Sequence, residues 1–113
     1  MISKIIVDPE GSANPESIEL FDGQAMEISV DANMWAVREG SSLDTAVWSV
    51  EDDGVGLGSN SESSNVSTAL VTVSSTGESK IKILLTLADG QIYPQWIYIL
   101  VKEMNRSTGR YWS

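Results

Sequence analysis

Short segments in which apolar and polar residues alternate recur through most of this chain, between residues 24 and 101. One of them places Trp48 between Ala46 and Val50. An alternation with period two puts one side of a strand into a core and leaves the other side in water. Several such segments, separated by Gly, Ser, Asn and Asp, indicate a small β-sandwich.

The pattern predicts seven or eight strands, and no segment keeps a helical period long enough to form more than a turn or two. The expected strands are residues 2–7, 18–20, 26–30, 46–50, 55–57, 69–73, 81–87 and 95–102. Residues 32–42 are expected to form a long connection with room for one helical turn, and the Ser-rich residues 58–65 a loop. The fold class is therefore all-β, an immunoglobulin-like antiparallel β-sandwich with almost no helix, with a jelly roll as the competing arrangement.

Two Asp-Gly pairs, Asp22-Gly23 and Asp89-Gly90, are typical of tight β-hairpins. We expect each of them to join two neighbouring antiparallel strands. At 113 residues the chain has the length of one domain. Residues 1–103 are expected to form the sandwich, and residues 104–113 a polar C-terminal tail.

The inward side chains of these strands should form the core. The expected core residues are Met26, Ile28, Val30, Trp48, Val71, Val73, Ile81, Ile83, Leu85, Ile97 and Ile99. A buried Trp needs a partner for its indole N–H, so Trp48 is interpreted as a packing residue without a functional role. Met34 and Trp35 are expected to fold back over one end of the sandwich; the alternative is that they are exposed at a contact.

Composition removes several kinds of chemistry. The chain has no His and no Cys, which excludes Ser-His-Asp and Cys-His nucleophiles, disulfides and thiolate metal sites. The consecutive carboxylates of residues 51–53 are interpreted as solvated rather than as a calcium site, because the spacing of a calcium loop is absent. We therefore expect a protein that binds or holds something, with no enzymatic activity, no metal and no cofactor.

The charge balance of 16 acidic and 7 basic residues, or −9 in total, disfavours nucleic acid as a partner. No apolar run approaches the roughly 20 residues of a membrane-spanning helix. The first residues, Met1 to Lys4, lack the pattern of a secretory signal, so synthesis in the cytoplasm is expected.

Two features indicate protein contacts. Trp96, Tyr98 and Leu100 share the outer side of the last strand, forming an apolar stripe about 14 Å long whose neighbours are expected to be apolar too. The alternative is a central strand whose outer side is covered by the N-terminal segment or by the tail. The tail is either a frayed terminus or an arm that docks on a neighbouring subunit, and its candidate contact residues are Arg106, Arg110, Tyr111 and Trp112.

Residues 21–101 resemble the immunoglobulin-like domains of tailed-phage virion proteins. The resemblance is closest to the small family of phage fibre–tail adaptor proteins and more distant to bacterial immunoglobulin-like repeats. It is carried by the strand at residues 26–30, by Asp31-Ala-Asn-Met-Trp35, by the segment of residues 42–50, by the Ser-rich stretch with residues 69–73, and by Leu85-Thr-Leu-Ala-Asp-Gly90. The tail and the aromatic outer side of the last strand depart from the family pattern.

The resemblance implies a structural virion protein without catalytic residues. It would be made in the bacterial host cytoplasm and bind other virion proteins and copies of itself. Placement at the tail, as a fibre adaptor, and on the capsid, as a decoration protein, are both compatible with it. The alternative from another class is a carbohydrate-binding or adhesion module that stacks Trp35 or Trp96 on a sugar ring.

Overall fold

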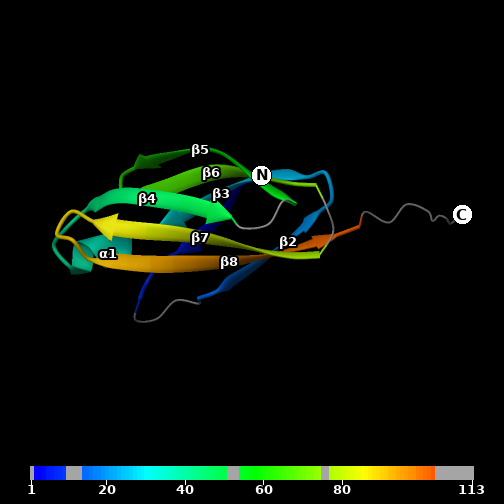
Figure 1. Ribbon diagram of the computed structural model, residues 1–113. Coiled ribbons are helices and arrows are strands. Elements are labelled where there is room, and N and C mark those ends of the chain that lie inside the picture. Colours follow the sequence, from blue (N-terminus) through cyan, green and yellow to red (C-terminus); the bar gives the residue numbers. More distant parts are fainter. Residues whose placement is uncertain (1, 10–13, 51–53, 75–76, 104–113) are drawn as a thin grey trace, which may run out of the picture.

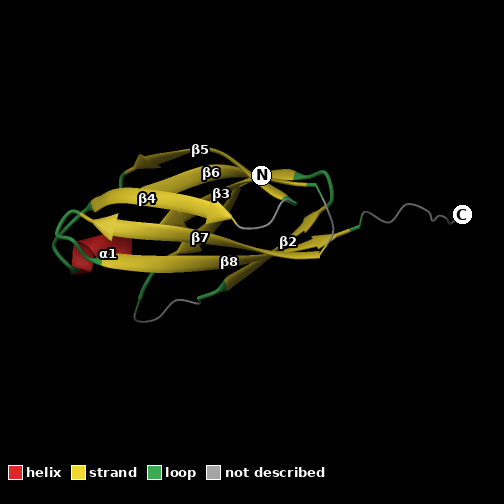
Figure 2. Ribbon diagram, viewed as in Figure 1, coloured by secondary structure: helices red, strands yellow, loops and turns green. Residues whose placement is uncertain are grey.

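The computed structural model describes residues 2–9, 14–50, 54–74 and 77–103. Most of the described chain is strand, with one short helix (Figure 2). The elements are β1 (Ile2–Ile6), β2 (Glu16–Phe21), β3 (Ala25–Asp31), α1 (Asn33–Arg38), β4 (Leu43–Val50), β5 (Val55–Ser63), β6 (Val66–Val73), β7 (Gly77–Leu87) and β8 (Ile92–Lys102).

The strands form two four-stranded sheets, with orders β1-β3-β6-β5 and β2-β8-β7-β4. Figure 1 shows them as two layers, with β4, β7 and β8 in front of β3, β5 and β6. Each sheet offers alternate side chains to the space between the layers, as expected for aligned sandwich packing. The predicted immunoglobulin-like sandwich is confirmed, with eight strands in the described residues.

Two of the strand pairs at the sheet edges are parallel, whereas the sequence predicts an antiparallel sandwich. β1 runs parallel to β3, and β2 runs parallel to β8. The expectation that Asp22-Gly23 closes a hairpin is wrong, because β2 and β3 lie in different sheets. The turn instead bridges the layers: the N–H of Asp22 donates to Lys102 O and the N–H of Gly23 to Val73 O, both at 2.9 Å. Gly23 suits this turn since its φ is +88°.

The second Asp-Gly pair joins β7 and β8 as an antiparallel hairpin, as the sequence predicts. The N–H of Leu87 donates to Gln91 O, and the N–H of Gly90 to Leu87 O.

The loop expected at residues 58–65 is mostly strand. β5 continues to Ser63 and pairs with β6, although the ladder is interrupted between Leu57 and Asn60. Ser64 and Asn65 form the tight turn, both with positive φ, a backbone that Asn tolerates better than most residues. Every β5 residue after Leu57 is exposed, so this part of the strand is held by its backbone ladder to β6 rather than by apolar packing.

The inward side chains pack as one cluster between the sheets. Of the expected core residues, those that are buried are Met26, Ile28, Val30, Val71, Val73, Ile81, Ile83, Leu85, Ile97 and Ile99. Trp48 differs: it packs against the cluster but is only half-buried, because β4 is an edge strand. Its indole N–H donates to Ser67 Oγ at 2.8 Å, across the gap between the two sheets.

Helix α1 closes one end of the sandwich (Figure 1). A carboxylate oxygen of Asp31 accepts the N–H of Asn33 at its start, and Gly40, with φ of +66°, follows its end. The helix buries Trp35 and Ala36, and the Trp35 and Tyr93 rings pack edge-to-face with their centroids 5.9 Å apart. This placement agrees with the expected fold-back of Trp35, whereas Met34 is 53% exposed.

Candidate interaction face

The outward side of sheet β2-β8-β7-β4, called the outer face here, carries the aromatic stripe. Alternation along β8 sends Ile97, Ile99 and Val101 into the core, and therefore Trp96, Tyr98 and Leu100 outward. Tyr98 is 44% exposed and Leu100 37% exposed, while Trp96 is half-buried. β8 is a central strand. The alternative in which β1 covers the stripe is wrong, since β1 pairs with β3 in the other sheet. The tail, which the sequence offered as another cover, lies outside the described residues.

The neighbours of Trp96 and Tyr98 on β7 are basic rather than apolar, which corrects the expectation from the sequence. The register of β7 on β8 places Lys80 beside Tyr98 and Lys82 beside Trp96. Lys80 Nζ lies 5.9 Å from the Tyr98 ring centroid, and Lys82 Nζ lies 5.8 Å from the Trp96 ring centroid. Each ammonium group is within the distance of a cation–π contact. The signal was present in the sequence, as alternate Lys residues in the β7 segment, but only the register aligns them with the aromatic rings.

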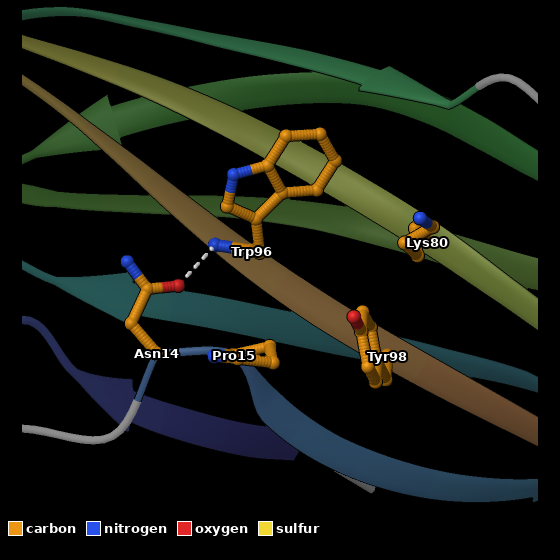
Figure 3. Close-up of a pocket in the computed structure, with 5 residues that line it drawn as sticks. All are labelled: Asn14, Pro15, Lys80, Trp96 and Tyr98. Carbon is orange, nitrogen blue, oxygen red and sulfur yellow. Dashed lines mark hydrogen bonds between the residues drawn. The ribbon is translucent and has the colours of Figure 1, made fainter.

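A pocket of about 240 Å³ opens beside the stripe (Figure 3). It is lined by Asn14, Pro15, Lys80, Trp96 and Tyr98. In Figure 3 the two aromatic side chains project from β8 and Lys80 from β7, while Asn14 and Pro15 precede β2. The pocket is shallow and its aromatic side chains do not converge on one point, as they would in a cleft built around a small molecule.

Asn14 fixes the wall of this pocket and was not singled out from the sequence. Its side-chain N–H groups donate to Tyr93 Oη at 2.8 Å and to Pro94 O at 2.9 Å. Its side-chain oxygen accepts the N–H of Trp96 at 2.9 Å and Nε2 of Gln95 at 3.5 Å. A primary amide has two donors and two acceptor lone pairs, so the bonding capacity of Asn14 is used within the protein.

The other end of the outer face is acidic. Leu100 lies between Glu78 of β7 and Glu19 of β2, which are its cross-strand neighbours. Glu19 pairs with Lys102 Nζ at 3.1 Å, in an exposed ion pair. Glu78 makes no ion pair with another described residue. The outer face thus changes from basic and aromatic at Trp96 to acidic and aliphatic at Leu100.

The remaining predicted contact residues, Arg106, Arg110, Tyr111 and Trp112, lie outside the described residues, as do the carboxylates of residues 51–53. Within the described ranges, no group of three or more Asp and Glu side chains could hold a metal ion. Over the same residues, the structure contains no helix that is both long and apolar enough to cross a membrane.

No protein-family model and no curated protein matches this chain. Solved structures do match. The cysteine protease inhibitor EhICP2 from Entamoeba histolytica is similar over 89% of this chain and 97% of its own, with a TM-score of 0.56 at 8% identity. The PKD domain of the KIAA 1837 protein is similar over 91% of this chain and 97% of its own, with a TM-score of 0.55 at 20% identity. At these identities the likeness shows a shared immunoglobulin-like sandwich.

Proposed function

We propose that this chain is a structural protein of a tailed-phage virion, where it docks on a neighbouring virion protein through the outer face. The observation that carries the proposal is the aromatic stripe on a central strand, in which Tyr98 and Leu100 are exposed at a position where a monomeric sandwich has no structural need for large apolar side chains. Aromatic residues beside basic ones are common anchors of protein interfaces. The phage context comes from the sequence resemblance of residues 21–101.

The architecture suits docking as a preformed block. The stripe lies on β8, which pairs with β2 on one side and with β7 on the other. Side chains held by a paired strand lose little conformational freedom when a partner covers them, so more of the contact energy remains as affinity. The acidic composition and the absence of His and Cys give no support to catalysis, and we propose no enzymatic activity.

Incorporation into particles tests the proposal. The double variant Trp96→Ala, Tyr98→Ala should retain a cooperative thermal transition and a β-type circular dichroism spectrum, while its amount in purified particles falls strongly. A matched control is Leu70→Ala, which removes an exposed side chain from the outward side of β6 in the other sheet. Equal incorporation of the double variant and the wild-type protein contradicts docking through the outer face.

Copy number separates the two placements in the virion. Quantitative gels of purified particles should show a small number of copies for a tail adaptor, and a number that follows the capsid lattice for a decoration protein. Detection only in the host cytoplasm, and never in particles, contradicts both placements.

Carbohydrate binding is the second candidate, since the pocket beside Trp96 combines aromatic and polar side chains. Two contacts weaken it. The amide of Asn14 has no bonding capacity left for sugar hydroxyls, and Lys82 Nζ lies over the Trp96 ring on which a sugar would stack. Tryptophan fluorescence titrated with a panel of glycans should therefore show no saturable change; a saturable change lost in Trp96→Ala would favour this candidate instead.

A further inference from the structure

The outer face is divided into rows of side chains by the strand register. One row contains Ser17, Tyr98 and Lys80, and is called the Tyr98 row. The next contains Glu19, Leu100 and Glu78, and is called the Leu100 row. Adjacent residues in a ladder point to the same side of the sheet, so the two rows lie side by side, about 7 Å apart. One row is basic and the other acidic.

We infer that the outer face binds a second copy of this chain, face to face. The two-fold axis lies in the plane of the interface, perpendicular to the strands, and runs between these two rows. The inference rests on the proposed function and deepens it, because it names a second copy of this chain as the neighbouring virion protein that the outer face binds. Rotation about such an axis lays β7 over β7 and β8 over β8 in opposite directions. Lys80 of each copy then faces Glu78 of the other, and Tyr98 faces Leu100, with every contact made twice.

The charged side chains of the outer face favour this axis over other two-fold axes. An axis over the Tyr98 row would oppose the two copies of Lys80, and an axis over the Leu100 row would oppose the two copies of Glu78. An axis along β8 would lay β2 over β7 and bring Glu19 against Glu78. Like charges that face each other in an interface are strongly unfavourable, and of these axes the one between the rows opposes no like charges and places Lys80 against Glu78.

The surface between the rows has the shape that such packing needs. One hollow of about 210 Å³ is lined by Glu78, Ser79, Lys80 and Tyr98. Another, of about 280 Å³, extends from β2 across β8 to β7 and includes Glu19, Leu100 and Glu78 in its lining. Both hollows are lined by Glu78 and Tyr98 and lie beside the proposed axis. A Tyr98 or Leu100 side chain from the second copy can enter them and replace solvent.

The two copies overlap over a small area, as expected for a weak, reversible dimer. The axis lies near one end of the sheet, so only β2, β8 and the first residues of β7 face their counterparts, with a planar footprint of about 300 Å² per partner. This is well below the roughly 800 Å² per partner of a standard interface, so the expected affinity is low. The net charge of −9 on each copy acts over longer distances and is largely screened beyond about 8 Å at physiological salt, whereas contact pairs are screened much less.

Charge reversal tests the inference on the full-length chain by sedimentation velocity over a range of concentrations. The wild-type protein should form a reversible dimer. Lys80→Glu and Glu78→Lys should each raise the dimer dissociation constant by about tenfold or more, because either change opposes like charges twice. A mixture of the two variants should recover a dimer of near wild-type affinity, since each altered residue then faces its opposite charge.

The matched control for Glu78→Lys is Glu27→Lys, which makes the same change of net charge at an exposed position in the other sheet and should leave the dissociation constant unchanged. A monomeric wild-type protein overturns the inference, as does a dimer that tolerates both single reversals, or a mixture that does not recover dimerisation. These outcomes are distinct from failure of the proposed function, which is read from the incorporation of Trp96→Ala, Tyr98→Ala into particles.

Discussion

The side-chain oxygen of Asn14 accepts the backbone N–H of Trp96 at 2.9 Å. Its amide also donates to Pro94 O, so one side chain bonds β8 on both sides of Gln95, much as a paired strand would. Asn14 thereby extends the contact between β2 and β8 beyond the start of β2 at Glu16. Asn14 and Pro15 are thereby held beside the aromatic stripe.

Replacement of Asn14 by Ala should lower the free energy of unfolding by about 1–2 kcal/mol, because several hydrogen bonds are lost at a partly solvated site. Urea denaturation measures the change, and amide hydrogen exchange should show faster exchange at the N–H of Trp96. Asn33→Ala is a suitable control, since the Asn33 side chain accepts one bond, from Asn65. Unchanged protection of the Trp96 N–H would show that the Asn14 amide does not hold the strand.

The two neighbours Met34 and Trp35 should respond very differently to truncation. Trp35 is 3% exposed and meets Tyr93, so Trp35→Ala should cost about 3–5 kcal/mol of stability. Met34→Ala removes a side chain that faces solvent and should change stability by less than about 0.5 kcal/mol. Thermal or urea unfolding of both variants checks the pair. Similar losses would contradict the placement of α1 over the end of the sandwich.

The bond between Trp48 and Ser67 should contribute a measurable coupling energy. The Ser67 hydroxyl is fully buried and accepts the indole N–H at 2.8 Å, joining β4 of one sheet to β6 of the other. A double-mutant cycle of Trp48→Phe and Ser67→Ala should give a coupling of about 1 kcal/mol. Ser49→Ala, outward on the same strand, serves as a reference that should be nearly neutral. Additive effects of Trp48→Phe and Ser67→Ala would mean that the bond adds nothing to stability.

Asn65 should be the most sensitive residue of the β5–β6 turn. Its side chain accepts the N–H of Leu43 at 2.8 Å and donates to Asn33 Oδ1 at 3.0 Å, and its φ is +67°. Asn65→Ala loses both bonds and strains the backbone, with an expected loss of about 2–3 kcal/mol. Asn65→Gly loses the bonds but tolerates the backbone, and should remain the more stable of the two. The reverse order in urea unfolding would contradict the turn geometry.

The sequence identified elements wherever apolar alternation was strong. β7 and β8 lie where the alternation of Ile81 to Leu87 and Ile97 to Val101 places them, because a two-residue period specifies both a strand and its buried side. β5 was missed beyond Leu57 because residues 58–63 carry no apolar signal. Residues 58–63 belong to a strand because β5 pairs with β6, and their own Ser and Asn side chains give no indication of that pairing.

The candidate interaction face likewise combines features that the sequence predicts with features that it does not. The outward position of Trp96, Tyr98 and Leu100 follows from the inward position of Ile97 and Ile99, so it could be predicted from β8 alone. The lysines beside the aromatic rings could not, because their position depends on the register between β7 and β8. The role of Asn14 could not be predicted either, because its hydrogen-bond partners lie about 80 positions away in the chain.

The amino-acid sequence by itself determined the class of fold, since alternation is local and each strand records which of its sides avoids water. It also excluded His- and Cys-dependent chemistry. Only the tertiary structure decided which sheet receives each strand, that β1 and β2 run parallel to their partners, and that basic and acidic rows adjoin on the outer face. Those features depend on how distant strands fit around a shared core, and no short segment of the chain carries that information.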